Sequence, residues 1–286
     1  MADISFLQER FEKKKIVEMI DEKGNTTGMP RHYIGLSGLA GGCMRNLWYT
    51  FRWVKASSIS GRTNRIFAVG HASEEVMVKD LRSIGIECWN VLDDQDEFTA
   101  AFGYAMGHPD GYGKGVPGNE EETHLLEFKT ANEKSFKDMV KKGVKESKPV
   151  YYGQMVLYMH MKALNKALFM MVNKNTSEYY TEIVDKNYDY AVELLKRGES
   201  IVFCENPNEF TRIGSGKPDW FECRWCNYND ICFGKEEVAE NCRTCQNCDL
   251  LGDGKFACGK DNDRLLNLDD QLKGCNLYEK MECFKI

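Results

Sequence analysis

The chain has 286 residues, of which 42% are hydrophobic and 29% charged, and its formal net charge is −6. The length allows one large domain with a small one appended, or two domains, and the composition is that of a globular protein. No apolar run approaches the length of a membrane span, so we expect no membrane partner. Residues 1–15 alternate charged and apolar side chains without a signal-peptide core, which predicts an intracellular, cytoplasmic protein.

Helices precede short strands in the first part of the chain. Amphipathic patterns predict helices at residues 4–22, 37–54 and 64–83. Short apolar segments predict strands at residues 86–91, 98–101 and 104–107. Ser37 can cap the second helix and Gly85 ends the third, while the last two strands form an antiparallel turn-back that leads to Asp110.

The rest of the chain continues this mixture and then changes character. Further strands are predicted at residues 123–130, 167–173 and 178–184, and further helices at residues 133–142, 150–164 and 187–198. Beyond Trp220, cysteines, glycines and turns dominate, with one short amphipathic piece at residues 268–272. The order of elements predicts a mixed α/β core at residues 1–235 and a cysteine-rich extension at residues 236–286.

Two short motifs place an acid at a turn and an acid–lysine pair on a strand. Asp110 lies in Gly-His-Pro-Asp-Gly, and Glu127 and Lys129 lie in the apolar run Leu-Leu-Glu-Phe-Lys-Thr. Because strand residues alternate between faces, Glu127 and Lys129 point the same way. An acid–x–lysine sequence is common on exposed strands, but charges on a buried strand need partners. Two carboxylates can hold divalent cations and a lysine can orient or activate water, so the motifs predict metal-assisted phosphodiester hydrolysis.

Two further pairs, each four residues apart on a predicted helix, are candidates to complete this site. His71 and Glu75 share one helix face, and imidazole and carboxylate groups both bind divalent metals. Gln154 and Tyr158 share another face and could hold a DNA backbone or base near the metals. Taken alone, each pair is better explained by a solvated or packed helix, and it becomes a site candidate only beside the acid–lysine strand.

Basic side chains surround these motifs in the sequence. Six lysines follow the acid–lysine strand, namely Lys134, Lys137, Lys141, Lys142, Lys145 and Lys148. A second basic region comprises Arg45, Arg52, Lys55, Arg62 and Arg65. Such side chains could contact phosphates and position DNA without reading its sequence, although a charge run is more often a solvated face.

The 12 cysteines favour metal binding over disulfides, given the intracellular location expected for the chain. Three thiolates come from Cys223, Cys226 and Cys232, and the candidate for a fourth is Cys43. Four thiolates bind either zinc or a four-iron, four-sulfur cluster, and the spacing does not separate the two. Cys43 is otherwise interpreted as a small buried core residue.

A second group of cysteines lies in the extension. A Cys-x2-Cys pair followed by later cysteines is typical of an intracellular zinc site. The ligands assigned to zinc are Cys242, Cys245, Cys258 and Cys275, with Cys248 as the substitute. A region of this length buries little core, so a bound zinc ion would supply much of its stability.

Together, these residues resemble the PD-(D/E)XK nuclease superfamily, and within it the RecB-like iron–sulfur branch. That branch includes the CRISPR-associated RecB-like exonucleases and their phage-borne relatives. The resemblance rests on His71, Asp110, Glu127, Lys129, Gln154 and Tyr158 for the catalytic motifs. For the cluster it rests on Cys43, Cys223, Cys226 and Cys232. It implies a restriction-endonuclease-like mixed sheet flanked by helices and held by a four-iron, four-sulfur cluster.

The activity that the resemblance implies is a metal-dependent DNA exonuclease acting on single strands or DNA ends, in recombination, repair or phage DNA metabolism. The expected ligands of Mg²⁺ or Mn²⁺ are His71, Glu75, Asp110, Glu127 and the main-chain carbonyl of Phe128. Lys129 would orient the attacking water, and Gln154 and Tyr158 would hold the strand. The iron–sulfur cluster would be structural.

Other classes of protein stay open at this point. The chain could be a structure-specific endonuclease, or a non-catalytic DNA-binding protein that assists recombination. A redox protein ranks last, because nothing resembles a flavin or nicotinamide site. The expected partners are DNA and a recombinase, annealing or single-strand-binding protein, in the host cytoplasm if a phage encodes the chain.

Overall fold

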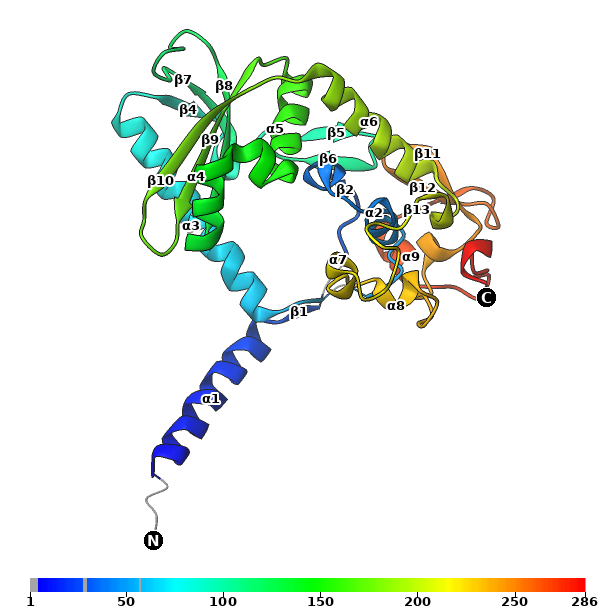
Figure 1. Ribbon diagram of the computed structural model, residues 1–286. Helices are drawn as coiled ribbons and strands as arrows, with labels where there is room; N and C mark the ends of the chain where they lie inside the picture. The colour runs from blue at the N-terminus through cyan, green and yellow to red at the C-terminus, as the bar shows by residue number, and fades with distance from the viewer. Residues whose placement is uncertain (1–4, 28–29, 57, 286) are drawn as a thin grey trace.

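The computed structural model describes residues 5–27, 30–56 and 58–285 (Figure 1). A five-stranded sheet in the order β10-β9-β8-β7-β4 forms its centre. The strands are β4 (Glu87–Trp89), β7 (Gly111–Lys114), β8 (His124–Ala131), β9 (Lys166–Asn173) and β10 (Tyr179–Asp185). Only the β8–β9 pair is parallel among the neighbours in this sheet, which confirms the predicted mixed α/β character.

Helices cover both faces of the central sheet. The helix α3 (Gly61–Ser83) packs on one face, and α4 (Glu133–Ser147) and α5 (Pro149–Lys162) pack on the other. The helix α6 (Tyr188–Phe203) lies beside α5 (Figure 1). Local sequence starts them: Ser60 and Asn132 cap α3 and α4 through their side chains, and proline opens α5.

Alternation along β8 divides the core into two layers. Leu126 and Phe128 belong to the buried cluster that also contains Met77 of α3. Leu125 belongs to the cluster on the opposite face, which includes the buried side chains of α5. Because side chains two residues apart share a face, Glu127 is directed toward α5.

The predicted turn-back at residues 98–107 forms, but in a separate sheet. The strands β5 (Phe98–Ala100) and β6 (Ala105–Gly107) pair antiparallel, and β6 pairs with β2 (Ile34–Gly35) in parallel. The strand β2 lies in the sequence between β1 (Thr26–Thr27) and β3 (Ser58–Ile59), which form a separate antiparallel pair. This small three-stranded sheet ends beside Asp110.

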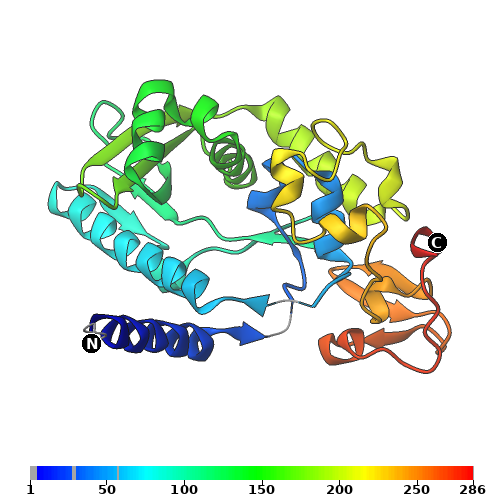
Figure 2. The ribbon, with the colours of Figure 1, turned by 60° about the horizontal axis from the view of Figure 1, so that its bottom comes forward.

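The prediction of one continuous helix at residues 37–54 is wrong. The chain forms a 3₁₀ segment, η1 (Leu36–Ala40), and a separate helix, α2 (Met44–Phe51). Gly41 and Cys43 between them adopt extended backbone angles. Consecutive glycines disfavour a continuous helix because their backbone loses the most entropy on ordering, so the helix restarts at Met44. The predicted N-terminal helix is present as α1 (Ser5–Gly24), and its C-terminal end contacts the start of α3, where Arg65 donates to Asp21 (Figure 2).

The cysteine-rich C-terminal part contains more regular structure than its sequence predicts. Two short helices, α7 (Phe221–Arg224) and α8 (Asn229–Cys232), precede a three-stranded sheet. Its strands are β11 (Cys248–Gly252), β12 (Lys255–Cys258) and β13 (Arg264–Leu266), and the predicted piece at residues 268–272 is the helix α9 (Leu268–Leu272). This sheet lies beside α2 in Figure 2, with Phe51 and Phe256 ring centres 5.9 Å apart.

Within the described residues, no helix combines the length and the apolar character that crossing a lipid bilayer requires.

Candidate active site and cysteine-lined cavities

Asp110 stands at the start of β7, where the chain leaves the small sheet for the central one. Its Oδ2 atom accepts a hydrogen bond from the main-chain N–H of Phe128 over 2.7 Å. The next residue, Gly111, has φ = 142°, and a Cβ atom there would lie 2.4 Å from Val91 Cγ1. The Asp-Gly turn therefore needs glycine, and it brings the acid against the middle of β8.

Glu127 and Lys129 come from β8 and meet Asp110. The Glu127 side chain is fully buried, and its Oε1 atom pairs with the Lys129 ammonium. Lys129 Nζ also lies 3.5 Å from Asp110 Oδ2 and donates to the Phe128 carbonyl over 3.0 Å. The ammonium thus lies beside both carboxylates, with the lysine side chain 22% exposed.

The charges at this site act on one another. Burial raises the pKa of the Glu127 carboxyl, against the effect of the Lys129 ammonium and with the help of the Asp110 charge. Burial by itself lowers the pKa of Lys129, but the charges of Asp110 and Glu127 outweigh burial and raise it. The lysine is therefore protonated, and in this arrangement it is a cationic donor rather than a free base.

Gln154 and Tyr158 of α5 reach the same site, as their spacing predicts. The Gln154 amide donates to Glu127 Oε2 over 3.1 Å, and its side chain is buried. Burial raises the pKa of the Tyr158 hydroxyl, and the charges of Glu127 and then Asp110 raise it further. Gln154 therefore orients the buried carboxylate, while the tyrosine hydroxyl packs beside the acids.

The helix α3 contributes a different acid from the one predicted. The His71 and Glu75 side chains are exposed, and the described contacts of Asp110 and Glu127 include neither. Glu74 is instead half-buried, and burial followed by the Asp110 charge raises its pKa to about 7. One residue along a helix turns the side chain by about 100°, so the register of α3 against the sheet decides which acid faces inward.

Two of the six lysines in the basic run after β8 form ion pairs along α4, and a third lies over a tyrosine ring. Lys137 pairs with Glu133, and Lys142 pairs with Asp138, each one helical turn apart on α4. Lys145 lies over the Tyr152 ring, 5.3 Å from its centre. These lysines therefore form a solvated helix face, which is the structural alternative to a role in phosphate binding.

The chemistry of the active-site donors suits a hard divalent cation. In the part of the chain that the structure describes, no three His, Cys, Asp or Glu side chains converge closely enough to hold a metal ion. Glu127 is fully buried and its Oε1 atom pairs with the Lys129 ammonium, so a metal ion bound to this carboxylate would share it with that lysine. Carboxylates and a main-chain carbonyl are oxygen donors of the type that Mg²⁺ and Mn²⁺ prefer.

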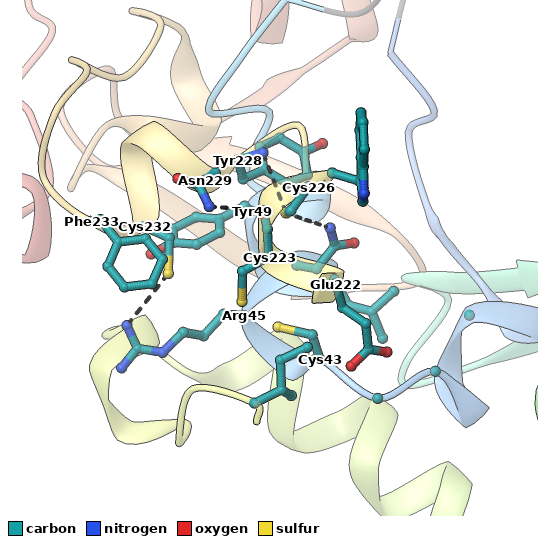
Figure 3. Close-up of a pocket in the computed structure, with 17 residues that line it drawn as sticks. Cys43, Arg45, Tyr49, Glu222, Cys223, Cys226, Tyr228, Asn229, Cys232 and Phe233 are labelled. Carbon is teal, nitrogen blue, oxygen red and sulfur yellow. Dashed lines mark hydrogen bonds between the residues drawn. The ribbon is translucent and has the colours of Figure 1, made fainter. Parts of the chain in front are cut away.

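The four cysteines predicted to act together line one cavity of about 390 Å³. Cys43 precedes α2, Cys223 lies in α7, Cys232 ends α8, and Cys226 lies between these helices. Their thiol groups gather around the same space in Figure 3, where the sulfur atoms of Cys43 and Cys223 point toward each other. Residues 180 and more positions apart in the chain therefore meet at one site.

The zinc ligands assigned in the extension also share a cavity, which is much smaller at about 20 Å³. It is lined by Cys242, Cys245, Cys248, Cys258 and Cys275. Burial raises the pKa of Cys242 to about 11, and the thiols of Cys275, Cys245 and Cys258 contribute after burial. Cys248 is more deeply buried: burial raises its pKa to about 12, the Arg52 charge lowers it and the Cys242 thiol raises it. The cavity therefore brings together the four assigned cysteines and their substitute, and the choice of zinc ligands among the five stays a prediction.

No family model and no curated protein matches this sequence. Among solved structures, the chain is similar to SSO0001, with 16% identity over 81% of this chain and 98% of that chain and a TM-score of 0.40. It is also similar to the alkaline exonuclease LHK-Exo from Laribacter hongkongensis, with 16% identity over 60% of this chain and 87% of that chain and a TM-score of 0.42. A structure of LHK-Exo in complex with dAMP gives 15% identity, 60% and 86% coverage and a TM-score of 0.44. At this identity and TM-score the similarity concerns only the course of the backbone. The function must therefore be inferred from the residues of the site.

Proposed function

We propose that this chain is a metal-dependent nuclease that hydrolyses phosphodiester bonds in DNA, as an exonuclease acting on single strands or ends. The observation that carries the proposal is the position of the Lys129 ammonium, next to the buried Glu127 carboxylate and 3.5 Å from Asp110 Oδ2. A binding protein has no use for an acid buried beside a lysine, because burying charges is costly. A nuclease uses the buried acid to bind a metal ion and the lysine to orient the attacking water.

Each residue has a role that follows from its contacts. Asp110, Glu127 and the Phe128 carbonyl would hold one or two Mg²⁺ or Mn²⁺ ions, which supply Lewis-acid stabilisation of charge on the phosphate. The Phe128 N–H fixes the Asp110 carboxylate, and the Gln154 amide fixes that of Glu127.

Lys129 and Glu74 complete the set. The protonated Lys129 would orient the attacking water and stabilise the developing negative charge, which a cationic donor does without changing its protonation. Glu74 takes the place that the sequence assigned to Glu75, because it is the half-buried acid of α3 that senses the Asp110 charge. Tyr158 lines the site through its hydroxyl.

We further propose two structural cofactors. The larger cysteine-lined cavity suits a four-iron, four-sulfur cluster, because four thiols from three separate segments share a space of about 390 Å³. The smaller cavity, about 20 Å³, suits one zinc ion held by the extension. The cluster would join α2 to the segment at residues 221–232, and the zinc would stabilise residues 236–286 as an appended unit.

The test is a paired nuclease assay on anaerobically purified protein with Mn²⁺. End-labelled single-stranded DNA and closed circular DNA are incubated with the wild type, Asp110→Ala and Lys129→Ala. Loss of activity by about 10²–10⁴-fold in both variants is expected, since each removes a group that acts on the reacting phosphate. Lys137→Ala is the matched control, because this lysine is exposed and paired only with Glu133.

Degradation of linear DNA with intact circles supports an exonuclease. Cutting of circles would move the protein to the endonucleases. Full activity of either active-site variant would refute the mechanism, and binding without cleavage by the wild type would favour a non-catalytic DNA-binding protein.

A further inference from the structure

The cysteine-lined cavity has an ordered set of hydrogen-bond donors aimed at its sulfur atoms. Asn46 Nδ2 donates to Cys226 Sγ over 3.3 Å, and the main-chain N–H of Tyr228 donates to the same sulfur over 3.4 Å. Arg45 Nη1 lies 3.9 Å from Cys232 Sγ, and this contact is drawn in Figure 3. Two of the four sulfurs thus receive donors from side chains in the first turn of α2.

Arg45 is held rigidly in this position. Its side chain is only 4% exposed, and its Nε atom donates to the Phe210 carbonyl over 2.7 Å. Its Nη1 atom also donates to Asn208 Oδ1 over 3.0 Å. In the described structure no carboxylate pairs with this guanidinium, so its buried positive charge faces a thiol group. A buried cation is stable only beside a negative group, and a metal-bound thiolate is one.

Two more arginines approach the cavity with unused donors. Arg212 donates to the Cys232 carbonyl over 2.7 Å, and Arg197 donates to the Gly41 carbonyl next to the Cys43 segment. The Nε atoms of both arginines are buried and have no hydrogen-bond partner among the described residues. These two arginines lie beside Cys232 and the segment before Cys43, and the cavity lining also includes the carboxylate of Glu222.

We propose that Arg45 and Asn46 are positioning residues that hold the sulfurs of Cys232 and Cys226 and raise the reduction potential of the cluster bound there. The inference rests on the iron–sulfur cofactor of the proposed function and goes beyond its structural role. Hydrogen bonds to ligand sulfurs and nearby positive charge both stabilise the more negative, reduced form of a cluster.

The experiment is a redox titration of the full chain, purified anaerobically, with dithionite as the reductant and electron paramagnetic resonance as the readout. Iron and acid-labile sulfide are measured first. Arg45→Gln and Asn46→Leu are expected to keep the iron and sulfide content of the wild type and to titrate at more negative potential. Arg45→Lys keeps the charge but loses the planar donor, so its potential is expected between those of the wild type and Arg45→Gln.

Lys55→Ala is the matched control, because it removes an exposed positive charge that pairs with Glu236 and has no described contact with the four sulfurs. Its potential is expected to equal that of the wild type. If Arg45→Gln fails to fold, Asn46→Leu carries the test alone.

The possible failures are distinguishable. Equal potentials in the wild type, Arg45→Gln and Asn46→Leu, at equal iron content, would overturn the inference. A wild type without iron and sulfide would refute the cofactor, while the nuclease assay with Asp110→Ala reports separately on the active site.

Discussion

The guanidinium of Arg243 lies 3.8 Å from the centre of the Trp53 ring. It also donates to the main-chain carbonyls of Phe51 and His32 and to the Gln271 side chain, and its own side chain is only 1% exposed. Arg243 belongs to the cysteine-rich extension, whereas Trp53 follows α2. The buried guanidinium of Arg243 therefore connects the C-terminal extension to the segment around α2 in the core.

This contact predicts that the extension and the core unfold together. Arg243→Ala leaves two carbonyl groups unpaired in the interior and removes a large buried side chain. We expect the free energy of unfolding to fall by about 3 kcal/mol or more. Urea unfolding followed by circular dichroism and by tryptophan fluorescence measures it. Lys55→Ala, which removes an exposed ion pair to Glu236, is the control and is expected to change stability by less than about 1 kcal/mol.

The backbone at Gly107 packs closely against the side chain of Tyr158 in the active site. A Cβ atom at this position would lie 2.3 Å from the Tyr158 hydroxyl and 3.0 Å from Leu36 Cβ. Gly107→Ala should displace Tyr158 and cost about 1–3 kcal/mol of stability, with a loss of nuclease activity. Adding Tyr158→Phe removes the clashing oxygen and is expected to restore part of the stability. If the double variant is no more stable than Gly107→Ala, the clash with the hydroxyl is not the cause.

Glu74 predicts a pH dependence of stability. Its pKa is raised from the ordinary 4.5 to about 7, first by burial and then by the Asp110 charge. Between these values the folded protein keeps a proton that the unfolded chain has released, so folding is favoured at low pH. This contribution is complete below pH 4.5 and disappears as the pH rises through about 7.

The measurement is the urea midpoint of the metal-free protein between pH 5 and pH 8 (about the range in which this group titrates). Glu74→Gln should flatten the decline, although Glu127, whose pKa is also raised by burial, leaves a remainder. Glu75→Gln is the matched control on the exposed side of the same helix. An identical effect of both substitutions would show that Glu74 is not the inward-facing acid.

The extension predicts one zinc ion with a defined ligand set. Cys242→Ser should remove about one equivalent of zinc and lower the unfolding temperature, because the ion supplies stability that this small region lacks. Cys248→Ser should keep the zinc, because Arg52 is the strongest electrostatic influence on this buried thiol, ahead of Cys242 and Cys245. The zinc content of the two variants and of the wild type is measured by mass spectrometry. Loss of zinc in Cys248→Ser alone would make Cys248 the ligand in place of an assigned cysteine.

Local pattern was enough to predict the strand that carries Glu127 and Lys129, and the pairing of the two strands at residues 166–185. The first prediction rests on a short apolar run that carries the acid–lysine pair, and the second on two strand-like segments joined by a polar turn at residues 174–177. The same pattern missed the break at Gly41, because a helix interrupted by two glycines keeps its apolar spacing on both sides. It also missed the small sheet of the extension, whose strands are short and whose turns resemble a loop.

The sequence by itself therefore determined the chemistry of this protein: the acids, the lysine, the helical partners of the site and the grouping of the cysteines. The tertiary structure alone decided which of two adjacent glutamates on α3 faces Asp110, and that Arg45 and Arg243 are buried rather than solvated. Residue type and spacing act over a few positions along the chain. The direction of a side chain and the burial of a charge depend instead on how distant elements pack, and no local period contains that information.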